Sequence, residues 1–180
     1  MMGAFLTFLK KYRDAKSGLA AVEFALIAPV LIALFLGSVT LSNALIVREK
    51  VASVASSAAD LVAQSTQISD SGMSDIFSAL NALVFPYSTD GAKIVIASII
   101  SDGKGGAKVA WSDAQNTAPY SVGQTITVPD GLITSTGSVI LAKIDYDYNS
   151  PVAGVVGNLL TMSDQFYARP RKTAQVKRVP

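Results

Sequence analysis

The sequence contains no cysteine and no histidine. Without cysteine the chain can form no disulfide, and it offers no thiolate metal ligand and no thiol nucleophile. Without histidine it lacks the commonest general base and the commonest metal ligand, which excludes a hydrolase built on a serine–histidine pair. We therefore expect no catalytic residue, no metal site and no cofactor. An enzyme would have to rely on serine, lysine or carboxylates alone.

Charged residues are also scarce, at 16 % of the 180 residues, whereas half of the residues are hydrophobic. An apolar run of 24 residues, Phe24 to Val47, contains no Asp, Glu, Lys or Arg, and fourteen of its residues are Leu, Ile, Phe or Val. Roughly 20 apolar residues suffice to span a bilayer, and these fourteen favour insertion by roughly 4 to 8 kcal/mol. The apolar run therefore predicts one membrane-spanning helix. About 110 to 120 residues remain outside it, enough for one small domain.

The charges divide the chain into three regions. Residues 1–18 carry four basic residues and Asp14, a net charge of +3. Residues 19–164 carry six basic and twelve acidic residues, a net charge of −6, and the last sixteen residues carry five basic residues and no acidic one. Because basic residues flank membrane helices on the cytoplasmic side, we expect a cytoplasmic N-terminus and a domain on the other side of the membrane.

A short motif joins the basic leader (residues 1–18) to the apolar run. Gly18 is followed by Leu19, and the carboxylate of Glu23 stands five residues after the glycine, directly before Phe24. A charge where a membrane helix begins is costly to bury and indicates a function. The arrangement resembles the processing site of type IV pilin precursors. The longer stretch from Gly18 to Leu31 resembles the TadE/TadG-like family, which comprises minor pilins or pseudopilins of the tight-adherence (Tad, Flp) pilus.

The resemblance implies that a prepilin peptidase cuts between Gly18 and Leu19. It also implies that Glu23 and Phe24 serve in processing and assembly, with the Glu23 carboxylate paired to the freed amino group of Leu19 in a neighbouring subunit. The expected partners are the peptidase, other pilins of the Tad system, the inner-membrane assembly platform and the assembly ATPase, but no nucleic acid. The expected location is the bacterial inner membrane, crossed once, with the C-terminal domain in the periplasm, or the extracellular pilus.

Two alternatives stay open. An ordinary secretory signal could be cut near Ala44, although the apolar stretch before that residue exceeds the roughly 7 to 15 residues of such signals. The chain could also be a single-pass, membrane-anchored periplasmic binding module that is never polymerised. The mature N-terminus distinguishes these alternatives from the pilin hypothesis.

An apolar stripe with helical spacing continues beyond the apolar run. Its members alternate by four and three residues, which predicts a helical stem over residues 48–68. They are Val47, Val51, Val54, Ala58, Leu61, Ser65 and Ile68. We expect the stripe to pack against the chain's own C-terminal domain, and contact with another subunit is the alternative. Ser69–Gly72 then predicts a break with a helix cap, followed by a short helix from Met73 to Val84 that Phe85-Pro86-Tyr87 ends.

From residue 93 onward the pattern changes to β-strands. The β-branched residues of 94–100 and the stretch 107–112 predict a hairpin, and 125–128, 138–148 and 166–169 predict further strands. The expected fold class is α+β, a long N-terminal transmembrane helix followed by a short helix and a small, mostly antiparallel sheet. Its pilin-like packing is what the resemblance implies. The predicted divisions are a leader (1–18), a transmembrane helix (19–47), the stem (48–68), a head (69–168) and a basic tail (169–180).

Three weaker motifs in the C-terminal half receive structural interpretations. The glycines around Lys104 suggest a phosphate-binding loop, but the Walker spacing is absent, so we predict a hairpin turn. The alternation of Asp145, Tyr146, Asp147 and Tyr148 predicts one acidic and one aromatic strand face rather than a calcium site. The basic tail is expected to be solvated or to dock on an acidic neighbouring head.

Overall fold

A computed structural model describes residues 17–180, except residue 104, residues 134–136 and residues 149–159. The chain divides into an N-terminal unit that ends at Ser42 and a C-terminal unit, Asn43–Pro180. The boundary falls inside one helix, α2 (Ser17–Ala63).

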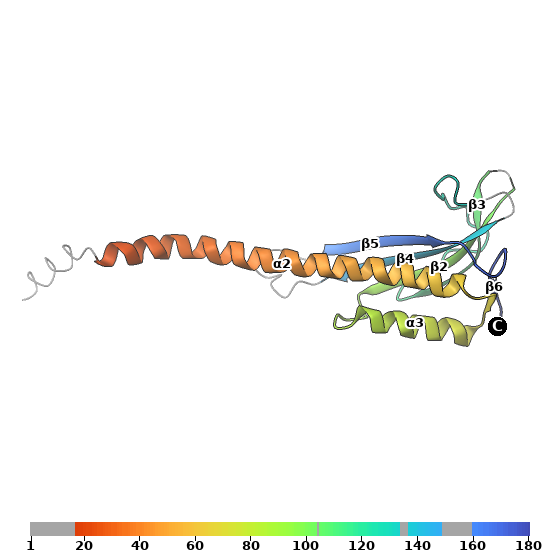
Figure 1. Ribbon diagram of the computed structural model, residues 1–180, viewed down its shortest axis with the longest axis horizontal. Coiled ribbons are helices and arrows are strands. Elements are labelled where there is room, and N and C mark those ends of the chain that lie inside the picture. The colour runs from red at the N-terminus through yellow and green to blue at the C-terminus, as the bar shows by residue number, and fades with distance from the viewer. Residues whose placement is uncertain (1–16, 104, 134–136, 149–159) are drawn as a thin grey trace, which may run out of the picture. The chain divides into compact units, whose positions relative to one another are not determined.

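The C-terminal unit combines the second half of α2 with a short helix, α3 (Asp70–Val84), and six strands (Figure 1). These strands are β1 (Gln67–Ile68), β2 (Ala92–Ser101), β3 (Ala107–Gln115), β4 (Ser138–Tyr148), β5 (Leu160–Ala168) and β6 (Lys177–Arg178). Four of them form an antiparallel sheet in the order β3-β2-β4-β5. The short strands β1 and β6 pair in parallel. The α+β layout with a small antiparallel sheet is therefore confirmed.

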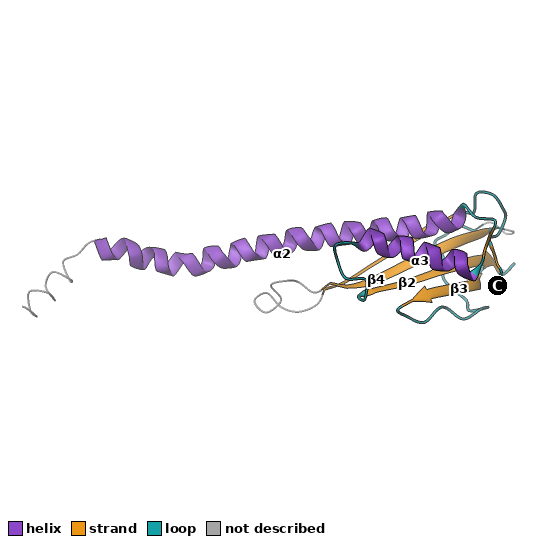
Figure 2. Cartoon of the chain, turned by 90° about the horizontal axis from the view of Figure 1, so that it is seen from below, coloured by secondary structure: helices purple, strands orange, loops and turns teal. Residues whose placement is uncertain are grey.

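The main core lies between the four-stranded sheet and the two helices, which run beside each other (Figure 2). Ile94 and Ile96 of β2 and Ile140 and Ile144 of β4 point to the helices and are fully or almost fully buried. Because successive strand residues face opposite sides, β2 and β4, together with β3, also supply a second cluster on the outer face of the sheet. It comprises Ile99, Ala107, Val139 and Leu141.

The predicted stripe on α2 packs on the chain's own sheet and α3. Val47, Val51, Val54 and Ala58 are buried in the main core, together with Ala55, Ala59, Val62 and Ala63. Leu61, which the sequence placed on the stripe, is exposed instead. At 100° per residue the buried face drifts along the helix, so that Val62 replaces Leu61 at its end. The helical stem also ends earlier than expected, at Ala63, and Ile68 is buried from strand β1.

Helix α3 ends as its sequence predicts but begins at Asp70, three residues before the predicted start at Met73. The side chain of Ser69 accepts a hydrogen bond from the backbone N–H of Gly72 at 3.2 Å, which satisfies one of the free donors of the first turn. Leu80 and Val84 turn into the main core, and the helix ends before Phe85.

The predicted hairpin, the strand 138–148 and a strand through 166–168 are confirmed, whereas the strand predicted at 125–128 is wrong. That segment makes only an isolated bridge between Thr125 and Lys108. Its alternating apolar side chains, Ile126 and Val128, pack on the outer cluster of the sheet together with Tyr120. The alternation therefore reflects coverage of a sheet face by a loop.

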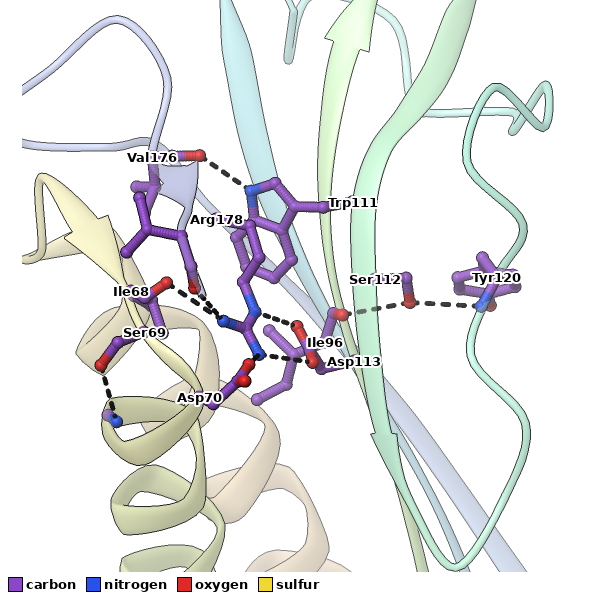
Figure 3. A network of polar contacts seen from close by, with 12 residues as sticks. Ile68, Ser69, Asp70, Ile96, Trp111, Ser112, Asp113, Tyr120, Val176 and Arg178 are labelled. Carbon is purple, nitrogen blue, oxygen red and sulfur yellow. Dashed lines mark hydrogen bonds and ion pairs between the residues drawn. The ribbon is translucent and has the colours of Figure 1, made fainter.

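The basic tail is not a solvated tail, because it folds back onto its own domain (Figure 3). Val176 is fully buried, and its carbonyl accepts a hydrogen bond from the indole of Trp111 at 2.8 Å. The guanidinium of Arg178 donates to both carboxylate oxygens of Asp113, at 2.9 and 3.1 Å, and to Asp70. These hydrogen bonds raise the pKa of Arg178 above its usual value, and the hydrogen bond with Asp113 contributes most.

Candidate membrane anchor and processing site

The N-terminal unit exposes a continuous apolar helix surface. Between Leu19 and Leu41 the large apolar side chains are exposed with the exception of Leu36, which is half-buried; Leu19 is 64 % exposed and Phe24 67 %. Monomeric soluble proteins rarely leave so large an apolar surface in water. The helix is long and apolar enough to cross a membrane, and one N-terminal helix of this kind indicates a single-pass membrane anchor.

The hydroxyl side chains in the apolar run are satisfied by their own helix. The hydroxyls of Ser38, Thr40 and Ser42 donate to the carbonyls of Phe35, Leu36 and Ser38 at 2.8 to 2.9 Å. Such bonds to the preceding turn remove the need for water around these hydroxyls. Pro29 lies inside the helix, where it leaves the carbonyl of Ala25 without its helical donor, as membrane helices tolerate.

Gly18 lies in the first turn of α2 as the structure describes it. A Cβ atom built at Gly18 would meet no heavy atom within 4 Å, and the same holds for Gly37 farther along the helix. Packing within the described part of the molecule therefore gives no reason for a glycine at position 18. The next residue, Leu19, is likewise exposed.

Glu23 is exposed, and no hydrogen-bond or ion-pair partner for its carboxylate is found among the described residues. Its neighbours one turn away on the helix are Leu19 and Ile27, neither of which carries a charge. Phe24 follows it on the exposed surface. Gly18, Leu19, Glu23 and Phe24 thus share one short helical segment, and within the described residues the structure brings no other functional group to them.

The carboxylates on the acidic face of β4 form ion pairs with lysines and accept hydrogen bonds from hydroxyls. Asp147 accepts from Lys93 at 2.7 Å and from Thr161 at 2.9 Å. The hydrogen bond from Lys93 lowers the pKa of Asp147, and Asp147 in turn raises the pKa of Lys93. Asp145 pairs with Lys143 and Ser163. Among the described residues no cluster of three Asp or Glu side chains suits a metal ion.

Gly103, Gly105 and Gly106 belong to the turn of the β2–β3 hairpin, whereas Lys104 lies outside the described residues. Asp102 and Gly106 close the turn through a backbone hydrogen bond of 3.0 Å, and the Asp102 carboxylate accepts from the Gly106 N–H at 2.8 Å. Gly103 and Gly105 have φ values of 76° and 89°, which residues with a side chain rarely adopt. The glycines therefore serve the turn, as predicted.

Sequence reasoning missed Phe85, which it treated only as part of a helix stop. The side chain of Phe85 is 75 % exposed at the end of α3, where the ammonium of Lys50 donates to its carbonyl at 2.9 Å. The only sequence signal for such a position is an aromatic residue directly before a proline that cannot continue a helix.

The N-terminal helix also matches a known family. Residues 18–60 match the model of a family described as TadE-like protein. No curated protein and no solved structure matches the chain. The matched range begins at Gly18, includes Glu23 and the apolar run, and ends within the part of α2 that packs on the sheet. Residues 18–60 are thus similar to the TadE-like family, which Gly18–Leu31 also resembles, and this similarity indicates a protein associated with the Tad pilus.

Proposed function

We propose that this chain is the precursor of a minor pilin or pseudopilin of the Tad (Flp) pilus. A prepilin peptidase removes residues 1–18, and the mature protein then joins other pilins through its N-terminal helix. The observation that supports this function is an exposed apolar helix whose glutamate near the start has no partner among the described residues, within the range that matches the TadE-like family.

The chemistry of Glu23 connects processing with assembly. An ionised carboxylate at the edge of a bilayer is costly unless a cation pairs with it. Cleavage after Gly18 creates such a cation, the amino group of Leu19. Because the described part of the chain offers Glu23 no partner, the Leu19 amino group of a neighbouring subunit is the group proposed to neutralise it.

The proposal assigns no catalytic step to this chain. Its partners are the peptidase, the other pilins, the inner-membrane platform and the assembly ATPase. The protein crosses the inner membrane once before assembly, with residues 1–18 in the cytoplasm and the C-terminal unit in the periplasm.

Mass spectrometry of the membrane-extracted protein tests the proposal. We expect a mature chain that begins at Leu19. Gly18→Val is expected to leave the leader attached, because a side chain would enter the subsite that accepts glycine. Gly37→Val is the matched control, since Gly37 lies in the same helix with equally open surroundings. An intact leader in the unmodified protein would contradict the proposal and favour the anchored binding module, whereas a start near Leu45 would indicate secretory cleavage.

A further inference from the structure

Three apolar side chains stay exposed at one end of the C-terminal unit. Phe85 is 75 % exposed, Ile46 47 % and Leu83 42 %, although this unit buries most of its other large apolar side chains. Ile46 belongs to α2, whereas Leu83 and Phe85 belong to the end of α3 and the residue after it.

Lys50 fixes the end of α3 beside α2. Its ammonium donates to the carbonyl of Phe85 at 2.9 Å and lies 3.5 Å from that of Leu83. These carbonyls are among those that a helix C-terminus leaves without a donor, and a lysine there also suits the helix dipole. Ile46 precedes Lys50 by four residues and so lies on the same face of α2, one turn earlier. The three exposed residues therefore lie near Lys50, and we call this set the Phe85 patch.

The position of the Phe85 patch along α2 coincides with the end of the apolar run. The last uncharged residue of that run is Val47, and Arg48, Glu49 and Lys50 follow it directly. Three residues of helix rise only about 4.5 Å. If the apolar run lies in the hydrocarbon core, the carbonyl of Phe85 stands at the level of the lipid headgroups. Apolar side chains such as Phe and Leu insert at the boundary between headgroups and acyl chains, and a lysine there keeps its charged end among the headgroups.

We propose that the Phe85 patch is a second membrane contact, in which Phe85, Leu83 and Ile46 enter the headgroup region of the bilayer. The occupant is the lipid surface rather than another protein, because Ile46 of the patch belongs to the apolar run itself and directly follows Leu45, which is also exposed. The inference rests on the membrane anchor within the proposed function. It requires neither cleavage after Gly18 nor assembly into a pilus.

The absence of native cysteine allows a direct test. Phe85→Cys and Leu83→Cys are each labelled with a polarity-sensitive fluorophore in the full-length protein. The protein is then reconstituted at high dilution into vesicles of phosphatidylethanolamine and phosphatidylglycerol. We expect a blue-shifted emission that quenchers attached near the lipid headgroups reduce severalfold. Fluorescence of Trp111, the single tryptophan, which is buried in the main core, confirms that each variant is folded.

Val122→Cys provides the matched control. Val122 is also 75 % exposed, but its neighbour Gly123 donates to Val109, which pairs with Ile99. Strand β2 begins at Ala92, seven positions after Phe85. Ile99 lies seven residues farther along this strand, roughly 23 Å from Ala92. A label at position 122 is therefore expected to remain in water and to be insensitive to the lipid quenchers.

The outcomes separate this inference from the proposed function. A label at position 85 that behaves like the label at 122 would overturn the membrane contact alone. A blue-shifted label that lipid quenchers do not affect would indicate a protein partner and would also overturn it. Failure of the protein to float with the vesicles would overturn the anchor itself and this inference with it.

Discussion

No contact within the described part of the chain accounts for Glu23 or for Gly18. The carboxylates of Asp60, Asp113 and Asp147 all hold basic side chains. Glycines of the hairpin turn are required by positive φ values. Glu23 has no such partner, and Gly18 has open surroundings without a positive φ. Gly37 and Glu49 share this lack of contacts within the described residues. We therefore assign Gly18 and Glu23 to interactions with other molecules because of their place in the motif at the start of the apolar run.

Replacement of Glu23 by alanine should separate membrane insertion from assembly. We expect Glu23→Ala to remain in the membrane fraction, because the apolar run is unchanged and a charge has been removed from its edge. Pilus assembly should fail, since the amino group of Leu19 would then lack its partner. Membrane fractionation and electron microscopy of piliated cells measure the two effects.

Glu49→Ala serves as the control for this prediction. Glu49 is an exposed glutamate on the same helix, but it follows the apolar run and lies outside the motif. We expect normal piliation in this variant. Normal piliation in Glu23→Ala as well would remove Glu23 from the assembly mechanism.

Among the secondary-structure elements, β6 has the largest role for its length. Its two residues pair with β1, directly after α2, and its Arg178 joins Asp113 of β3 to Asp70 of α3. The tail before β6 adds a backbone hydrogen bond of 2.8 Å from Arg171 to the carbonyl of Ala63 and an ion pair between Arg171 and Asp60. The C-terminal strand therefore connects both helices to the edge of the sheet.

Loss of the Arg178 side chain should destabilise the C-terminal unit. The Asp113 side chain that accepts its hydrogen bonds is mostly shielded from solvent, whereas the Asp70 side chain is exposed. We expect Arg178→Ala to lower the free energy of unfolding by about 1 to 3 kcal/mol. Urea titration of the detergent-solubilised protein, followed by the fluorescence of Trp111, provides the measurement.

Lys177→Ala is the control, because Lys177 is the exposed neighbour of Arg178 in the same strand. Its replacement should change the free energy of unfolding by no more than about 0.5 kcal/mol. Equal effects of the two substitutions would show that the Arg178 network contributes nothing beyond strand pairing.

The whole molecule combines two units with opposite surface properties. The N-terminal unit exposes its apolar side chains, whereas the C-terminal unit buries its own between a sheet and two helices. The N-terminal unit is stabilised only in a lipid or protein environment, whereas most of the surface of the C-terminal unit is compatible with water. This contrast is the basis for one membrane crossing and a folded domain beside the membrane.

Single cysteines should report the orientation of the chain in the membrane. We expect a membrane-impermeant maleimide to label Val122→Cys in spheroplasts, because the positive-inside rule places the C-terminal unit outside the cytoplasm. A cysteine in the leader, Thr7→Cys combined with Gly18→Val to retain the leader, should react only after lysis. The reverse pattern of labelling would contradict the predicted orientation.

The sequence by itself determined the features that depend on local chemistry. These are the presence of the long apolar helix, a helix cap within Ser69–Gly72, the hairpin turn and the spacing of Gly18 and Glu23. Each can be predicted because period, capping groups and turn residues act over a few neighbouring positions.

Only the tertiary structure decided the features that depend on residues far apart in the chain. Arg178 meets Asp70 across 108 positions, Lys50 reaches Phe85 across 35, and residues 125–128 cover a sheet face instead of forming a strand. No local pattern specifies such contacts, because they exist only after the sheet and the helices have packed together.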